Sequence, residues 1–157
     1  MNKSEPGGAI HMQRMITAIA ALALFCTTAA AEEHFGVKAY PNVKTDASTD
    51  RYCRRYVQGS ENATKKAGHA SIRTEAYCFR TSDDFARVAA FYRKQKGLEL
   101  LGNIANTPGS KAAVFCLPEM QCAALGSGVD VTITSPWTDD KKKQNDVMIT
   151  IRESRQK

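Results

Sequence analysis

The clearest pattern of hydrophobic and polar positions lies between residues 72 and 97. Residues 72–80 alternate between apolar and polar side chains, which predicts a half-buried β-strand. Residues 81–96 place apolar side chains at helical spacing, forming a stripe of Phe85, Val88, Ala89 and Tyr92. A hydroxyl N-cap at Thr81 or Ser82 and a C-terminal Gly97 complete the signals of a helix. We therefore predict a strand followed by the main helix of the domain.

Further strand patterns follow this helix. Residues 98–104 and 112–117 are short apolar segments separated by a Pro-Gly turn at 108–109. Residues 129–134 and 147–151 alternate strictly, and the polar stretch 135–145 between them suits the tip of an antiparallel hairpin. These patterns predict an α+β fold, with an antiparallel sheet of four or five strands and the 81–96 helix packed on one face.

The stretch 32–69 carries weaker signals. Residues 32–45 are polar and rich in turn formers, which predicts an extended arm. A short helix is expected after a cap at Asp46 or Ser48, with one face formed by Thr49, Tyr52, Cys53 and Tyr56. Residues 58–68 are rich in Gly, Ser, Asn and Lys, which predicts a loop. We expect 32–69 and an α+β core over 70–157 to form a single domain, 32–157.

Residues 1–31 have the order of a cleavable secretory signal peptide. Arg14 precedes an apolar run that begins at Met15, and small residues at Ala29 and Ala31 satisfy the cleavage pattern. We therefore expect cleavage after Ala31, no transmembrane span in the mature chain, and a periplasmic or secreted location. The alanine-rich run is typical of a bacterial signal.

Two other interpretations of this segment are less favoured. An uncleaved membrane anchor would need roughly 18 apolar residues, and the run from Met15 is shorter and interrupted by threonines. A lipoprotein with a lipidated Cys26 would need a small residue before the cysteine, where this chain has Phe25. The starting methionine stays open among Met1, Met12 and Met15.

Cysteine content agrees with export. Cleavage would remove Cys26 and leave Cys53, Cys78, Cys116 and Cys122, and an even number in an exported chain predicts disulfides. Three pairings are possible. We favour Cys53 with Cys78 and Cys116 with Cys122, because each pair closes a loop within a neighbouring stretch of chain. The spacing of the second pair differs from that of a redox motif, so a structural bridge is favoured.

Three short motifs resemble those of a known group of proteins. They are Tyr40-Pro41, the strand and helix that end in Phe91-Tyr92-Arg93-Lys94, and Val131-Thr-Ile-Thr-Ser-Pro-Trp137 with Asp139. Over roughly Gly36 to Arg152, the chain resembles small exported bacterial proteins of unknown function. The resemblance implies a compact secreted α+β domain and brings no catalytic residues. Four cysteines are not a feature of that group, so the disulfides are predicted from this chain alone.

Residue types that carry catalysis or bind metals do not form a recognisable pattern. His34 and His69 are not at metal-ligand spacing. The pair Asp83-Asp84 is explained by the electrostatics of a helix N-terminus, and the pair at 139–140 by neighbouring lysines at 141–143. We therefore predict no catalytic residues, no metal site and no cofactor.

Charge suggests one kind of partner. The chain carries 22 Lys and Arg against 16 Asp and Glu, and basic residues cluster at 54–55, 65–66, 141–143 and along the 81–96 helix. If these groups converge, a patch that includes Arg87, Lys94, Lys141 and Lys142 would attract anionic envelope polymers or lipid headgroups. Nucleic acid is the least favoured partner because no nucleic-acid-binding motif accompanies the charge.

Trp137, the only tryptophan, lies in the predicted hairpin tip. An exposed tryptophan is a common interface anchor, whereas one that folds back would cover the edge of the sheet, and we slightly favour the second. The leading hypothesis is a non-enzymatic periplasmic or secreted binding module that uses the sheet surface and the Trp137 tip, with another envelope protein or an anionic envelope polymer as its expected partner. Alternatives are an envelope-associated hydrolase or accessory factor, and a basic surface that binds anionic envelope components. A concave polar pocket would favour the hydrolase hypothesis, and a flat patch rimmed by charge would favour the binding module.

Overall fold

The structure is a computed structural model, and it describes residues 32–68, 72–102, 108–117, 127–139 and 142–156. Its elements, in chain order, are β1 (Glu33–His34), β2 (Val37–Lys38), α1 (Ala47–Lys66), β3 (Ile72–Thr81), α2 (Phe85–Arg93), β4 (Glu99–Gly102), β5 (Lys111–Cys116), β6 (Gly128–Ser135), β7 (Trp137–Asp139), β8 (Lys142–Gln144) and β9 (Val147–Gln156). The predicted signal peptide with its cleavage residues lies outside the described residues, as do His69, Cys122 and Lys141.

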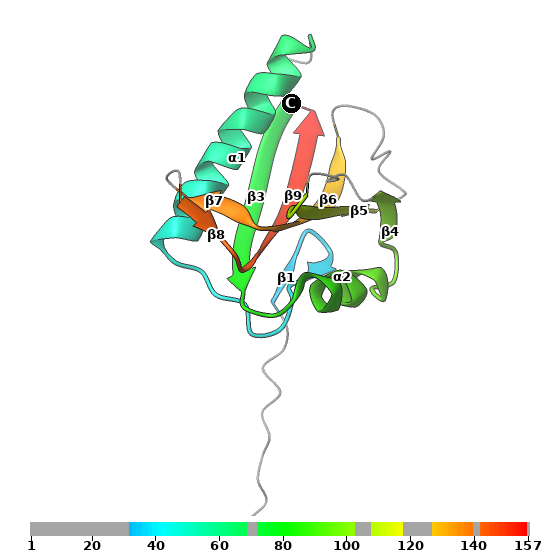
Figure 1. Cartoon of the computed structure of the whole chain (residues 1–157). Coiled ribbons are helices and arrows are strands. Elements are labelled where there is room, and N and C mark those ends of the chain that lie inside the picture. The colour runs from blue at the N-terminus through cyan, green and yellow to red at the C-terminus, as the bar shows by residue number, and fades with distance from the viewer. Residues whose placement is uncertain (1–31, 69–71, 103–107, 118–126, 140–141, 157) are drawn as a thin grey trace, which may run out of the picture.

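Five strands form one antiparallel sheet in the order β3-β9-β6-β5-β4 (Figure 1). β3 pairs with β9 from Ile72 opposite Gln156 to Thr81 opposite Val147. β6 and β9 are the two arms of the predicted hairpin, and the small β7–β8 hairpin is inserted between them. The predicted α+β class and antiparallel sheet are therefore confirmed.

One face of the sheet is apolar, and α2 packs against it. Alternate residues of a strand point to opposite faces, so the odd-numbered positions of β6 and β9 share this face. The buried aliphatic residues there are Val129, Val131, Ile133, Val147, Ile149 and Ile151. α2 contributes Val88, Ala89 and Tyr92 to the same core. The main hydrophobic core therefore lies between the sheet and α2.

The segment before α1 belongs to this core, because α2 and the turn that follows it bind its backbone. The amide of Gln95 donates to the carbonyl of Lys38 (2.9 Å), and its oxygen accepts from the N–H of the same residue (3.1 Å). The N–H of Tyr40 donates to the hydroxyl of Tyr92 over 3.2 Å. Val37, Ala39 and Tyr40 are buried as a result.

α2 begins later than the sequence predicts. Its N-cap is Asp84, whose Oδ1 accepts from the backbone N–H of Ala86 (2.7 Å) and Arg87 (3.3 Å). Thr81, one of the two predicted caps, is still extended because it pairs with Val147 at the end of β3. A carboxylate satisfies the first N–H groups and also suits the positive end of the helix dipole.

α1 is much longer than the predicted short helix. Its cap is Asp46, as one of the two predictions had it, and a reciprocal capping box joins Asp46 to Thr49. The helix then continues through 58–66, where a loop was predicted. Glycine, serine and asparagine are weak helix formers, but contacts with the sheet overcome this. For example, Glu61 Oε1 accepts from the N–H of Thr74 in β3 over 3.2 Å.

A disulfide between Cys53 and Cys78 joins α1 to β3, with a Cα–Cα distance of 5.6 Å. This confirms the first favoured pairing, and a loop of this length is expected to contribute about 3.5 kcal/mol through the unfolded chain. Cys116 is disulfide-bonded as well. Such bridges are typical of an oxidising compartment. Within the described ranges, no helix has both the length and the apolar character needed to cross a membrane.

Candidate ligand pocket at the end of the sheet

An open pocket with a volume of about 450 Å³ lies where one end of the sheet meets the start of α2. Four segments line it: the turn between β3 and α2, the start of β5, the end of β6, and the β8–β9 region. Residues 111, 135 and 147 are odd-numbered strand positions, so this pocket shares the α2 face of the sheet with the apolar core.

The turn between β3 and α2 supplies the acidic part of the pocket. Asp83 and Asp84 line it together with Ser82 and the half-buried Phe85. The hydroxyl of Tyr40 donates to Asp83 Oδ2 over 2.5 Å. Burial and this bond to Asp83 raise the pKa of the Tyr40 hydroxyl, which therefore stays a donor near neutral pH. The arm thus fixes the position of the Asp83 carboxylate.

The strands supply the basic part. Lys111 begins β5 and Lys143 lies in β8, and both side chains line the pocket. Ser135 and Pro136 follow from the end of β6. The hydroxyl of Ser135 donates to the carbonyl of Asn145 over 3.4 Å, which joins the end of β6 to the β8–β9 turn. The pocket therefore holds both signs of charge within one hollow.

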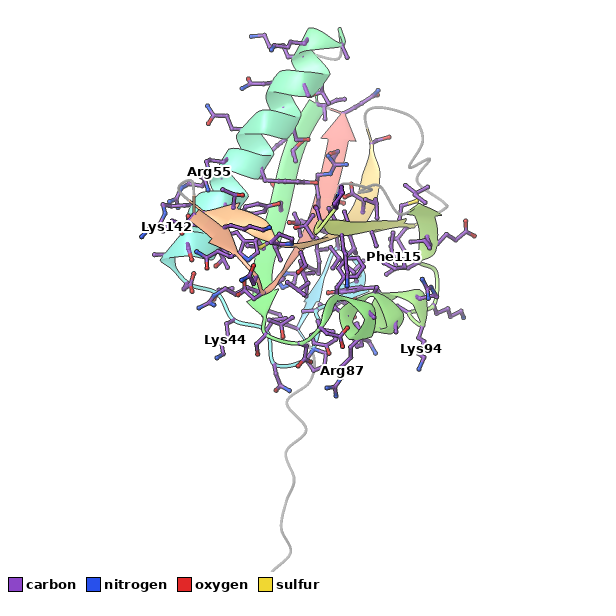
Figure 2. The ribbon with its side chains drawn as sticks, viewed as in Figure 1. Lys44, Arg55, Arg87, Lys94, Phe115 and Lys142 are labelled. Atoms are coloured by element: carbon purple, nitrogen blue, oxygen red, sulfur yellow. A yellow bond between two sulfur atoms is a disulfide. The ribbon has the colours of Figure 1, made fainter. Side chains whose placement is uncertain are left out.

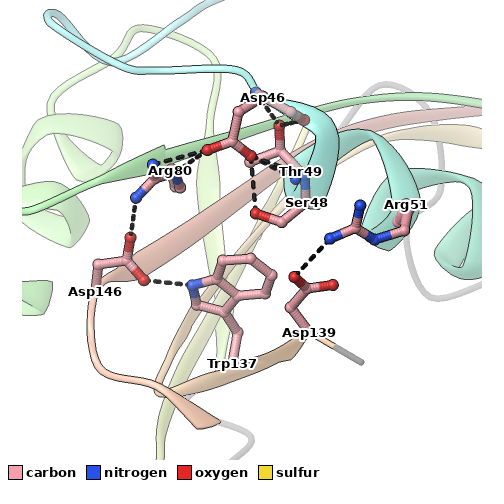
Figure 3. A network of polar contacts seen from close by, with 8 residues as sticks. All are labelled: Asp46, Ser48, Thr49, Arg51, Arg80, Trp137, Asp139 and Asp146. Carbon is pink, nitrogen blue, oxygen red and sulfur yellow. Dashed lines mark hydrogen bonds and ion pairs between the residues drawn. The ribbon is translucent and has the colours of Figure 1, made fainter. Parts of the chain in front are cut away.

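A network of polar contacts lies on the opposite face of the sheet, which α1 covers (Figure 3). It fixes two of the segments that line the pocket, the end of β6 and the β8–β9 turn. Arg80 donates from Nε to Asp46 Oδ2 (2.8 Å) and from Nη1 to Asp146 Oδ2 (3.1 Å). The indole N–H of Trp137 donates to Asp146 Oδ1 over 2.5 Å. One carboxylate, that of Asp146, therefore ties the β7–β8 hairpin to β3 and, through Arg80, to the start of α1.

Residues that line the pocket and residues that belong to this network are neighbours along the chain. Pro136 lines the pocket and Trp137 enters the network, while Asn145 lines the pocket and Asp146 enters the network. The network therefore acts on positions next to the pocket residues and fixes the backbone that presents them. The same arrangement lowers the pKa of Asp46 to about 2, chiefly because its carboxylate accepts from the N–H of Thr49, with Ser48 and Arg80 adding to the effect.

Trp137 is not the exposed interface anchor that one of its two interpretations required. The indole is buried, with 4% of its surface exposed, and its ring meets that of Tyr52 edge to face at a centroid distance of 5.6 Å. It folds back under α1 and joins a small cluster with Cys78 and Met148. Trp137 therefore presents no exposed aromatic surface to a partner.

The predicted basic residues lie in two separate places. Figure 2 shows Arg87 and Lys94 along α2, whereas Lys142 lies beside Arg55 at the α1 side of the molecule. Arg87 is also near a carboxylate, with its Nε 4.0 Å from Asp83 Oδ2. The condition for a single basic patch, convergence on one side, is therefore not met by the described members of this set.

Asp139, the described member of the second carboxylate pair, is bound by residues that the sequence did not predict as its partners. Asp139 Oδ2 accepts from Arg51 of α1 over 3.0 Å, and Arg55 lies 3.7 Å from Oδ1. Among the described residues, the charges that neutralise Asp139 therefore come from α1, while Asp140 and Lys141 lie outside the described residues. His34 is buried and stacks on Tyr77 with ring centroids 3.8 Å apart, and its Nε2 lies 3.2 Å from Glu32 Oε1.

The pocket residues Lys111, Ser135 and Asn145 were not singled out from the sequence. They are separated along the chain and come together only through the β5–β6 pairing and the fold of the hairpin.

Comparisons of the chain with protein-family models, with curated proteins and with solved structures found no match. No group of three or more His, Cys, Asp or Glu side chains that could hold a metal ion is present among the described residues.

Proposed function

We propose that the protein is a non-enzymatic binding module of the periplasm or the secreted fraction, and that the pocket at the end of the sheet is its ligand site. The observation that carries this proposal is the pocket itself, a hollow of about 450 Å³ lined by charged and hydroxyl side chains from four segments. This volume falls within the range of small-molecule sites, about 300 to 1,000 Å³. The Cys53–Cys78 disulfide supports export to an oxidising compartment.

A concave polar pocket is also the feature that would favour the hydrolase alternative. Hydrolysis by a side chain needs a nucleophile within hydrogen-bond reach of a base. In the described contacts, the Ser135 hydroxyl donates to a backbone carbonyl, and neither Asp83 nor Asp84 accepts from a serine of the pocket. The carboxylates bind Tyr40 and cap α2 instead. The contacts therefore support binding better than catalysis.

The experiment that tests this proposal follows backbone amide shifts by NMR while a soluble extract of bacterial envelope is added. We expect the largest shifts at residues 82–85, 109–111 and 143–147. Lys143→Met should weaken the binding that causes these shifts about five-fold, because Lys143 lines the pocket and offers one exposed ionic contact. Lys142→Met is the matched control, since neighbouring strand residues point to opposite sides and Lys142 does not line the pocket.

Binding that Lys143→Met leaves as strong as in the wild type, or shifts that centre on the exposed Tyr77 or Leu101, would place binding elsewhere and overturn the assignment of the pocket. Release of a chemically altered extract component by the wild type, lost in a Ser135→Ala variant, would replace the binding module by the hydrolase. Mass measurement of the mature N-terminus tests export separately, and an N-terminus at Glu32 is expected.

A further inference from the structure

The charged groups of the pocket are divided by sign between its segments. Asp83 and Asp84 come from the turn between β3 and α2, whereas Lys111 and Lys143 come from β5 and β8. The ion pairs within the described ranges join neither lysine to a carboxylate. The pocket lysines and the pocket carboxylates therefore do not cancel each other in pairs, and the only cation paired with either carboxylate among the described residues is Arg87, whose Nε lies 4.0 Å from Asp83 Oδ2.

Each carboxylate keeps one oxygen available. Tyr40 binds Oδ2 of Asp83, and the N–H groups of Ala86 and Arg87 bind Oδ1 of Asp84. In the part of the chain that the structure describes, the other oxygen of each carboxylate accepts no hydrogen bond. Both aspartates can therefore accept from a ligand without giving up the contacts that hold them in place.

Apolar surface accompanies the charges. Phe85, Pro136 and Val147 also line the pocket; the first two are half-buried and Val147 is buried. A ligand that reaches the aspartates and the lysines together would lay its own carbon atoms on these side chains. The pocket thus offers an acceptor pair, a donor pair and an apolar contact surface.

We infer that the ligand carries both an ammonium group and a carboxylate, as does a short peptide with free termini; this inference rests on the proposed function. A ligand of one sign would be attracted by one pair of side chains and repelled by the other, which costs affinity and specificity. A ligand of both signs satisfies the aspartates with its ammonium group and the lysines with its carboxylate.

Four forms of one probe test this inference: tri-alanine, N-acetyl-tri-alanine, tri-alanine amide, and the peptide blocked at both ends. Amide shifts of the pocket residues report the dissociation constant of each form. Tri-alanine should bind best, and each single block should weaken binding about five-fold, the effect of losing one exposed ionic contact. Lys143→Met should weaken tri-alanine but leave the tri-alanine amide unchanged, and Asp83→Asn should weaken tri-alanine but leave the N-acetyl form unchanged.

The outcomes separate this inference from the proposed function. Equal binding of the free and N-acetyl forms, or of the free and amide forms, would overturn the requirement for two charges and leave the pocket as the ligand site. Pocket shifts with envelope extract but with no tri-alanine form would overturn the peptide-like ligand alone. The absence of pocket shifts with both would overturn the pocket as well. Lys142→Met should bind all four forms as the wild type does.

Discussion

α2 covers a face of the sheet on which β6 and β9 present aliphatic side chains, whereas α1 covers a face on which the same strands present hydroxyl and charged side chains. The hydroxyl and charged residues on the α1 side are Asp130, Thr132, Thr134, Thr150 and Arg152, and the buried Met148 of β9 is an apolar residue on the same side. α1 meets them with polar or amphipathic groups: the hydroxyl of Tyr52 lies near Thr134 and Thr150, and that of Tyr56 lies near Thr132. Burial raises the pKa of both tyrosine hydroxyls, so they remain donors.

The α1 face also holds a charged pair in place of an apolar contact. Arg152 donates from Nε to Asp130 Oδ2 (2.6 Å) and from Nη1 to the hydroxyl of Ser60 in α1 (3.0 Å). Its guanidinium lies 5.9 Å from the centre of the Tyr56 ring. Burial raises the pKa of Asp130 even though Arg152 favours its charged form.

The two faces of the sheet contribute differently: one mainly stabilises the fold, and the other mainly positions its elements. Apolar burial is non-directional and stabilises roughly in proportion to area, so the α2 face supplies most of the folding free energy. Hydrogen bonds and ion pairs contribute less net free energy but need defined geometry. The contacts on the α1 face therefore set the position of α1 and of the β7–β8 hairpin. Pro136 and Asn145, which flank this hairpin, line the pocket.

The largest loss of stability is expected on the apolar face. Phe115 is fully buried against Tyr92, and Phe115→Ala should lower the free energy of unfolding by about 3 to 5 kcal/mol through lost burial and a cavity. Urea unfolding measures this change in the free energy of unfolding. On the other face, Thr132→Ala at a half-buried position should cost about 1 kcal/mol. Equal losses would remove the contrast between the faces.

The disulfide comes next. Replacing Cys53 and Cys78 together by serine should lower the free energy of unfolding by about 3.5 kcal/mol, since the unfolded chain regains the freedom of the closed loop. Hydrogen exchange should then quicken along α1 and leave α2 unchanged. Uniform acceleration in both helices would show that α1 does not depend on the bridge for its position.

Arg80→Met should have a smaller effect on stability but a visible one on the pocket. It leaves Asp46 and Asp146 without their shared partner, at a cost of about 1 to 3 kcal/mol. The amide chemical shifts of Asn145 and of the residues next to Pro136 should change, because the hairpin loses its connection to β3 through Asp146. Arg73→Met, which removes an exposed pair with Glu75, is the control and should change neither quantity.

The smallest effect is a pH dependence at the start of α1. The folded-state pKa of Asp46 is about 2, below its usual value of 3.8. Its contribution to stability is therefore complete above about pH 4 and is lost as pH falls toward 2. Asp46→Asn, which can still cap the helix, should flatten this part of the stability curve measured by urea unfolding. An unchanged slope would mean that other carboxylates dominate acid unfolding.

Sequence patterns revealed the apolar half of this molecule much better than the polar half. The alternation in β6 and β9 and the stripe of α2 follow directly from burial on one face. α1 was underestimated because its weak helix formers are held by distant partners, such as Glu61 with Thr74. The pocket could not be predicted, since Lys111 and Lys143 are brought together only by the pairing of strands and the β7–β8 hairpin.

Hydrogen exchange with and without envelope extract tests the central claim, that the pocket on the α2 face is where this protein binds. Ligand should slow exchange in the segments 82–87 and 143–147 while exchange in α1 stays as it was, and Lys143→Met should reduce the protection that Lys142→Met retains in full. Protection that appears along α1, or that both variants retain equally, would contradict the account.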